Sequence, residues 1–205
     1  MPRAARTLLF FILLPISLAS GAAEKSILVY GDSISAAYGM AQDRGWVALL
    51  GERLKRERPD YSVVNASVSG ETSSGGLARI DAALARHKPS LLILELGGND
   101  GLRGLPVEEM KKNLGTIIER SQKAGVRVLL VGMSMPPNYG PHYTQAFQAA
   151  FGELAKRYRT PLVPSLLEGF GENYELFQPD RIHPAEEAQP LMVERVWKTL
   201  QPMLR

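Results

Sequence analysis

The sequence predicts an α/β protein in which helices cover both faces of a parallel β-sheet. Short apolar segments alternate along the chain with longer segments of helical periodicity, a pattern typical of repeated βαβ units. Three of the short segments are apolar almost throughout, as expected for strands that are buried on both faces. The sequence contains no internal repeat and no linker-like stretch, so a single domain is expected.

The first half of the chain contains two strand and helix pairs. We expect strands over residues 27–30 and 61–66, and helices over residues 46–58 and 74–87. Pro59 directly follows the first helical segment, and a residue without an amide hydrogen commonly ends a helix.

The second half continues the same alternation. We expect strands over 91–96, 126–131 and 162–163, and helices over 106–125, 143–158 and about 184–200. Pro106 suits the first position of its helix because its φ angle is already helical and its missing N–H has no partner there. The segment over 91–96 is apolar except at Glu95.

Residues 1–23 have the layout of a secretory signal peptide. A head with two arginines precedes an apolar run, and small residues end the segment at Ala22 and Ala23. The run is shorter than the roughly 20 residues of a membrane span, and Pro15 interrupts it. We therefore expect cleavage after Ala22 or Ala23, export to the periplasm or out of the cell, and one folded domain over residues 24–205.

Charge and cysteine content narrow the classes of function. The formal net charge is +3, but two positive charges lie in the predicted signal peptide and the others are interspersed with acids. Such a distribution argues against a nucleic-acid-binding surface. The chain has no cysteine, which excludes disulfides and a lipid anchor on a cysteine. We expect a monomer with a small-molecule substrate and no stable membrane span after processing.

Polar residues follow each of the first three predicted strands. Ser33 follows the first strand, Gly70 lies in the loop after the second, and Asn99 lies in the loop after the third. The carboxyl ends of parallel strands meet at one edge of the sheet, where ligands bind. We therefore expect these three loops to converge on one site.

Among three histidines, His183 is the best candidate for a general base. Asp180 lies three residues before it, and in a turn this spacing can bring the carboxylate to one ring nitrogen and leave the other free. Pro184 is expected to open a helix behind it. His87 ends a predicted helix, where histidine favours the helix dipole, and His142 lies in a loop without a nearby carboxylate.

Two serines compete for the role of nucleophile. Ser134 stands in a near match to the nucleophile elbow G-x-S-x-G, but Pro136 replaces the last glycine and nothing nearby supplies extra amide donors. Ser33 follows Gly31 and Asp32 at the end of a strand, beside the converging loops. A turn or a helix cap is the alternative role of Ser33.

Gly70 and Asn99 are candidate hydrogen-bond donors to an oxyanion. Gly70 has no side chain, so its backbone N–H can approach a ligand closely, and Asn99 offers a side-chain amide. Both residue types also suit turns, and the residues alone leave that alternative open.

The loop over residues 133–143 follows the fourth strand and should reach the same edge. Its apolar surface is expected to form a wall of the substrate site. The residues that we expect to contact substrate are Met133, Pro136, Tyr139 and Tyr143.

These motifs resemble those of the SGNH hydrolases, also called the GDSL esterase/lipase family. Ser33 stands in Gly-Asp-Ser-Ile-Ser, Gly70 in Ser-Gly-Glu-Thr, Asn99 in Gly-Gly-Asn-Asp, and His183 in Asp-Arg-Ile-His. The resemblance spans nearly the whole mature chain and is strongest to the periplasmic acyl-CoA thioesterase, lysophospholipase and arylesterase subgroup. It implies a flavodoxin-like, three-layer α/β/α sandwich around about five parallel strands. Arg181 departs from the pattern, since close relatives often have glycine there, and should affect the local turn or the pocket rim.

The resemblance implies a serine hydrolase that cleaves carboxylic esters and thioesters. In that reading Ser33 attacks the carbonyl, His183 moves the proton, and Asp180 orients His183. The backbone N–H groups of Ser33 and Gly70 and the side chain of Asn99 would hold the oxyanion. No metal is expected, because the chain has no H-E-x-x-H motif and no second histidine at ligand spacing. No cofactor is expected, because the chain has no Walker loop and no dinucleotide-binding fingerprint.

Two alternatives to this function remain open. Related SGNH enzymes remove acetyl groups from sugars, so a carbohydrate O-deacetylase could use the same scaffold. A non-catalytic binding protein is the other alternative, and the intact set of Ser33, Asp180 and His183 argues against it.

Overall fold

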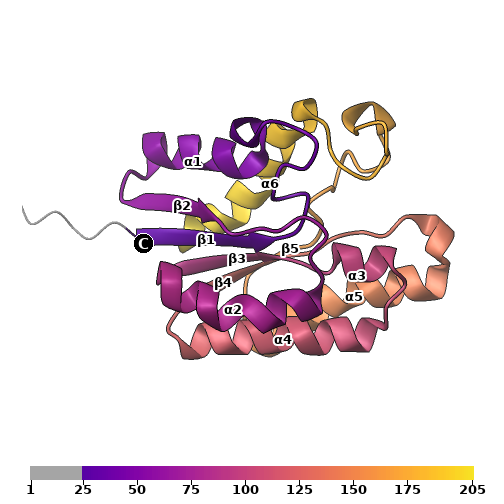
Figure 1. Ribbon diagram of the computed structural model, residues 1–205, viewed down its shortest axis with the longest axis horizontal. Helices are drawn as coiled ribbons and strands as arrows, with labels where there is room; N and C mark the ends of the chain where they lie inside the picture. The colour runs from indigo at the N-terminus through magenta and orange to yellow at the C-terminus, as the bar shows by residue number, and fades with distance from the viewer. Residues whose placement is uncertain (1–24) are drawn as a thin grey trace, which may run out of the picture.

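The computed structural model describes residues 25–205, in which a five-stranded sheet forms the centre of the molecule (Figure 1). The predicted signal peptide lies outside the described residues. All strand pairs are parallel, and the strand order is β2-β1-β3-β4-β5, which is that of the flavodoxin-like folds. The strands are β1 (Lys25–Gly31), β2 (Tyr61–Asn65), β3 (Leu91–Glu95), β4 (Arg127–Val131) and β5 (Leu162–Val163).

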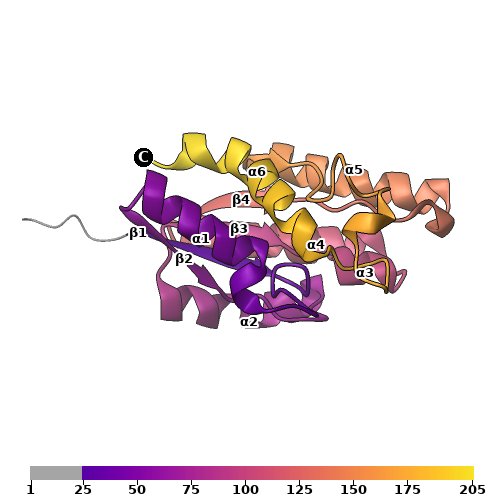
Figure 2. The same cartoon turned by 90° about the horizontal axis from the view of Figure 1, so that it is seen from above.

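Helices cover both faces of the sheet and complete a three-layer sandwich (Figures 1 and 2). The helices α1 (Trp46–Glu57) and α6 (Gln189–Leu200) pack side by side on one face. The other face carries α2 (Ser73–His87), α4 (Val107–Lys123) and α5 (Pro141–Tyr158). The predicted α/β/α fold is therefore confirmed.

The core lies between these layers and explains the apolar strands. Residues 27–30 and 91–94 of the two central strands are completely buried, as a sheet covered on both faces requires. Glu95, at the end of β3, is the one polar residue of this strand. It is buried like its apolar neighbours and is only 2% exposed. In the parallel register Glu95 lies beside Gly31, two residues before the candidate nucleophile Ser33.

Several boundaries differ from the sequence prediction by one or two residues, and three differences have a clear structural reason. Helix α4 begins at Val107, because Pro106 has an extended ψ angle of 122° and caps the helix from outside. The last helix begins at Gln189, because Pro184 instead forms an antiparallel bridge with Phe177. A short helix, α3 (Gly98–Leu102), replaces the predicted loop after β3, and five residues are too few to show helical periodicity.

The segment between β5 and α6 contains little regular structure. It runs over residues 164–188, and its regular structure consists of two short 3₁₀ turns, at Tyr174–Leu176 and Glu186–Ala188, and the bridge between Phe177 and Pro184. No helix within residues 25–205 combines the length and apolar character that crossing a membrane would need.

The strand order reverses its direction of growth at β1, which has β2 on one side and β3 on the other. In parallel sheets this switch point opens a crevice beyond the carboxyl ends of the two central strands. Ser33 lies two residues after the end of β1, and α3 begins after the two residues that follow β3. The topology therefore brings the first and third predicted loops to the same crevice.

Candidate active site

Ser33, His183 and Asp180 form one continuous chain of hydrogen bonds. His183 Nε2 lies 2.9 Å from Ser33 Oγ, and His183 Nδ1 lies 2.6 Å from Asp180 Oδ2. The carboxylate can only accept, so it places a proton on Nδ1 and leaves Nε2 free to accept from the serine hydroxyl. This arrangement can move the hydroxyl proton to the imidazole.

A tight turn holds Asp180 in this position. Its Oδ1 accepts hydrogen bonds from the backbone N–H groups of Ile182, at 2.9 Å, and His183, at 3.0 Å. Burial favours a raised pKa for Asp180, but the hydrogen bonds from His183 and Ile182 outweigh it and lower the pKa. The carboxylate therefore remains ionised and can stabilise a positively charged imidazole.

Arg181 stands at the centre of this turn in a left-handed conformation, with φ of 57°. Glycine adopts this conformation at no steric cost, so a glycine at this position would be less strained than arginine. The Arg181 guanidinium packs over the ring of Tyr174, 5.3 Å from its centre, at the rim of the site.

Two residues that the sequence did not indicate support His183. The Tyr38 ring packs against the imidazole with 4.6 Å between ring centres. Gln178 donates from its side chain to the Tyr38 carbonyl at 2.8 Å, and its backbone N–H donates to the His183 carbonyl at 2.8 Å. Neither residue carries a motif, so only the folded chain shows these contacts.

Gly70 lies in the loop after β2, as predicted, whereas Asn99 lies in α3, the short helix that replaces the predicted loop after β3. Asn99 sits in the first turn of α3, and its Nδ2 lies 3.1 Å from a carboxylate oxygen of Asp32. Gly70 has a positive φ of 78°, and its carbonyl accepts from Arg103 Nη2 at 3.0 Å. Helix α3 thus carries Asn99 and, at its end, the arginine that holds the Gly70 loop.

A cavity of about 1130 Å³ opens beside these groups. Ser33 and Asn99 line it together with both polar and apolar side chains, and the apolar ones contribute more of its surface. Apolar lining residues from three separate segments are Leu102, Met133, Met135, Pro136, Leu167, Phe170, Tyr174, Phe177 and Ile182. A hollow of this size and character can hold an apolar chain next to the serine hydroxyl.

The predicted substrate residues divide into two pairs. Met133 and Pro136 are among the residues that line the cavity. The Tyr139 hydroxyl instead donates to the Leu102 carbonyl at 2.9 Å, and the Tyr143 hydroxyl donates to a backbone carbonyl on the same connection at 2.8 Å. The two tyrosines therefore brace the loop that follows α3.

The geometry agrees with a comparison of the sequence against known families. Residues 29–189 match the model of the GDSL-like Lipase/Acylhydrolase family. The chain belongs to this family. The predictions of the family and of an ester hydrolase are thereby confirmed.

Several members of the GDSL-like family resemble the chain over nearly its full length. The chain is 51% identical to Esterase TesA of Pseudomonas aeruginosa, over 92% of this chain and 94% of the relative. It is 40% identical to Thioesterase 1/protease 1/lysophospholipase L1 of Escherichia coli, over 96% of this chain and 91% of the relative. A solved structure of the psychrotrophic esterase EstA from Pseudoalteromonas sp., inhibited by monoethylphosphonate, superposes on the chain with a TM-score of 0.84. The two proteins are 39% identical, and the superposition covers 88% of this chain and 98% of EstA.

The alternative candidates for the base and the nucleophile are less well placed than His183 and Ser33. His87 ends α2 and His142 is exposed near the start of α5, and neither lines the cavity of Ser33 among the residues that the structure describes. Ser134 does line this cavity, but its hydroxyl donates to Ser165 at 3.1 Å. The geometry thus favours Ser33 over Ser134 as the nucleophile.

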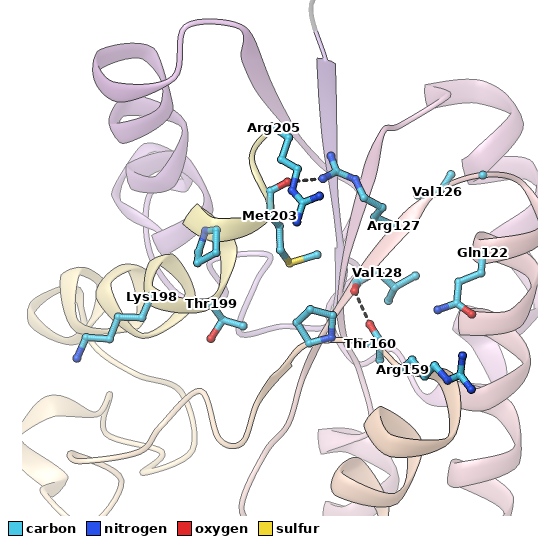
Figure 3. Close-up of a pocket in the computed structure, with 13 residues that line it drawn as sticks. Gln122, Val126, Arg127, Val128, Arg159, Thr160, Lys198, Thr199, Met203 and Arg205 are labelled. Carbon is cyan, nitrogen blue, oxygen red and sulfur yellow. Dashed lines mark hydrogen bonds between the residues drawn. The ribbon is translucent and has the colours of Figure 1, made fainter.

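A second hollow, of about 890 Å³, lies at the opposite edge of the sheet, where β4 and β5 begin (Figure 3). Its lining includes Arg127, Arg159 and Thr160, and none of the predicted site residues. Thr160 donates its hydroxyl proton to the Val128 carbonyl, and Arg127 donates to the Met203 carbonyl. These bonds tie the strand starts and the last turn together.

Within residues 25–205, no group of three or more acids, histidines or cysteines has an arrangement suited to a metal ion.

One buried acid, Glu95, lies close to the turn that carries the candidate nucleophile. Glu95 accepts from the Ser35 hydroxyl at 2.6 Å. Burial and the nearby Asp32 carboxylate raise the pKa of Glu95 well above its usual range. A side chain at Gly31 would bring a Cβ within 2.5 Å of a Glu95 carboxyl oxygen, so glycine makes room for this acid.

Replacing Glu95 with glutamine should make the melting temperature less dependent on pH. The folded chain keeps the Glu95 proton, whereas the unfolded chain releases it above about pH 4.3, so this group destabilises the fold as the pH rises towards its folded pKa. Glutamine resembles the neutral acid and can still accept from Ser35. The melting temperature of Glu95→Gln minus that of the wild type should therefore increase from about pH 5 to about pH 8. A difference that stays constant over this range would contradict the assignment.

Proposed function

We propose that the chain cleaves carboxylic esters and thioesters through an acyl-enzyme on Ser33. The observation that supports this proposal most strongly is the hydrogen-bonded chain from Ser33 through His183 to Asp180 beside a largely apolar cavity. The proposal agrees with the names of the relatives, which include an esterase and a thioesterase/lysophospholipase.

The proposed reaction has two halves. Ser33 Oγ attacks the carbonyl carbon while His183 Nε2 takes the hydroxyl proton, and a tetrahedral oxyanion forms. When it collapses, the bond to the alcohol or thiol breaks, and the leaving group takes the proton from His183. A water molecule then attacks the acyl-enzyme, with His183 accepting its proton and returning it to Ser33. Asp180 keeps the imidazole in the required tautomer throughout.

The oxyanion would be held by the backbone N–H groups of Ser33 and Gly70 and by the side chain of Asn99. All three belong to segments that follow the carboxyl ends of β1, β2 and β3, at the same edge of the sheet. Such donors stabilise charge that is concentrated on the oxygen only in the transition state.

Replacing Asn99 with alanine should therefore lower kcat by about 10²–10³-fold and leave KM nearly unchanged. Asn99→Asp should lose at least as much, because its carboxylate would face both the developing anion and Asp32. Steady-state kinetics on a p-nitrophenyl ester would measure both variants, with circular dichroism as the control for folding. A folded Asn99→Ala protein with the kcat of the wild type would show that Asn99 only forms the turn.

The largely apolar cavity supports an acyl chain rather than a sugar as the group next to Ser33. In a carbohydrate O-deacetylase the sugar would also occupy this hollow of about 1130 Å³, so the choice rests on the apolar character of the lining and not on its size. A panel of p-nitrophenyl esters from acetyl to palmitoyl, run beside acetylated sugars and an acyl-CoA, tests this choice. Preference for acetylated sugars would favour the deacetylase, and no turnover at all would favour a binding protein.

Truncation of Tyr174 should change the preference among these esters. Tyr174 is exposed and lines the cavity, so its ring offers apolar contact to a chain long enough to reach it. For Tyr174→Ala we expect kcat/KM to fall roughly 3–10-fold for long acyl chains and to change little for the acetyl ester, as the loss of a few apolar contacts implies. Equal scaling of every chain length would assign Tyr174 a purely structural role.

We also propose that the protein is exported and acts as a monomer. The composition of residues 1–23 supports export. The N-terminal sequence of the mature protein would locate the cleavage site, which we expect after Ala22 or Ala23. Size-exclusion chromatography with light scattering would give the oligomeric state.

A further inference from the structure

Asp32 is a buried acid next to the nucleophile for which the proposed reaction has no step. It lies between Gly31 and Ser33, is 2% exposed, and does not contact the imidazole through any hydrogen bond that the described residues show. Leaving a carboxylate buried is costly unless its hydrogen bonds compensate for the lost water. The partners of Asp32 therefore indicate what the chain gains from it.

Each oxygen of Asp32 accepts one hydrogen bond. Oδ1 accepts from the backbone N–H of Ile34 at 3.1 Å, and Oδ2 accepts from Asn99 Nδ2 at 3.1 Å. The first bond shapes the turn that displays Ser33. The second joins β1 to α3, the helix that carries the proposed oxyanion donor. A Cβ on Gly98 would stand 3.0 Å from Oδ2, so a glycine at this position leaves the carboxylate room.

The bond to Asn99 selects one of two orientations of the amide. An ionised carboxylate only accepts hydrogen bonds, so it attracts the amide nitrogen and repels the amide oxygen. The nitrogen has two hydrogens, and after one is donated to Asp32 the other remains for the substrate. If the amide rotated by half a turn, its oxygen would face Asp32 and an acceptor would take the place of the donor.

We propose that Asp32 is the positioning residue that fixes the Asn99 amide as a hydrogen-bond donor to the oxyanion. This inference rests on the proposed function, in which Asn99 binds the oxyanion. It assigns a role to the second residue of the Gly-Asp-Ser motif, and that role is exerted through another side chain.

The charge of Asp32 is part of this role. Burial raises the pKa of Asp32 to about 6, whereas the bonds from Ile34 and Asn99 and the positive charge of His183 act against it. The buried acids Glu95 and Asp100 also face it, and Asp100 raises its pKa further. When Asp32 gains a proton, one of its oxygens becomes a hydrogen-bond donor. The side chain can then no longer accept from both the Ile34 N–H and the Asn99 amide. The hold on Asn99 should then weaken as the pH falls through this pKa.

A double-mutant cycle tests whether Asp32 acts through Asn99. Asp32→Asn should lower kcat by roughly 10–100-fold with little change in KM, since an amide at position 32 no longer fixes the orientation of Asn99. In the Asn99→Ala background the same substitution should cost less than about 2-fold, because the group that it positions is gone. Two losses that multiply in the double variant, or a loss confined to KM, would overturn the proposal.

Asp100→Asn provides the matched control. Like Asp32, Asp100 is a buried acid, but it lies on α3 and accepts from the backbone and side chain of Ser73 rather than from Asn99. Whatever its own effect on kcat, that effect should be the same in the wild type and in the Asn99→Ala protein. Thermal melts followed by circular dichroism would show that each variant is folded.

A measurement without substitution at position 32 keeps the proposal testable if Asp32→Asn does not fold. In the His183→Ala protein, the side-chain amide signals of Asn99 in a ¹H–¹⁵N spectrum should shift with a midpoint near or above pH 6 as Asp32 titrates. Asn99 signals that stay constant over the pH range in which the carboxyl carbon signal of Asp32 itself titrates would overturn the proposal. Labelling of Ser33 by a fluorophosphonate decides the proposed function separately. A labelled Ser33 with a fully active Asn99→Ala variant would overturn the role of Asp32 and leave the nucleophile in place.

Discussion

Replacing Ser33 with alanine is expected to lower kcat by about 10⁴–10⁶-fold, a loss that no other single substitution in the chain should exceed. Alanine removes the only atom that forms the acyl bond, and the remaining donors can assist only a slow direct attack by water. Hydrolysis of a short p-nitrophenyl ester, measured with the variant at high concentration, gives the residual rate. The fold should persist, because Ser33 contributes a single hydroxyl at the end of β1 and not an apolar contact of the core.

Covalent labelling gives a second readout for the same assignment. The EstA structure from Pseudoalteromonas sp. is of an enzyme inhibited by monoethylphosphonate, so a fluorophosphonate is a suitable probe for a member of this family. The probe should modify one peptide, which contains Ser33, and Ser134→Ala should be labelled as fast as the wild type. Label on Ser134, or a Ser33→Ala protein that keeps its activity, would contradict the assignment.

Replacing His183 with alanine is expected to lower kcat by a similar factor, about 10⁴–10⁶-fold. The serine hydroxyl would lose the acceptor that lies 2.9 Å from Oγ, and the leaving group would lose its proton donor. Loss of both functions from one side chain explains why the effect should approach that of removing the nucleophile. Fluorophosphonate labelling of Ser33 should slow in parallel, because the probe needs the same proton transfer.

The other two histidines are the natural controls for this variant. His87 lies at the end of α2 and His142 near the start of α5, so His87→Ala and His142→Ala should keep most of the activity. An inactive His142→Ala protein beside an active His183→Ala protein would reverse the assignment of the base.

The sequence was sufficient to predict the sheet and the catalytic candidates because both follow local rules. Uniform apolar runs identify buried strands, and residues placed just after them are carried to one edge of a parallel sheet. This reasoning brought Ser33 and Asn99 together without any knowledge of distance. His183 came from a different signal, namely a carboxylate at a spacing that a turn can close.

The parts that the sequence did not predict depend on contacts between distant segments. Helix α3 is too short to show a period, and Pro184 joins a bridge with Phe177 that no local pattern reveals. The cavity wall from the segment over 164–188 was missed for the same reason. Glu95 did give a signal, since a lone acid in an apolar strand calls for an explanation, but its partners became visible only in the fold.

The nucleophile and the base lie on parts of the chain that differ in how firmly they are held. Ser33 follows β1, in which residues 27–30 are completely buried, whereas His183 and Asp180 belong to the segment over 164–188, which has few backbone hydrogen bonds of regular structure. Such segments open locally at a lower free energy than the core. As the temperature rises, the base should therefore leave the serine while the sheet is still intact. Inactivation would then precede unfolding and reverse on cooling, and contacts around Gln178, rather than the packing of the core, would limit the temperature range of the enzyme.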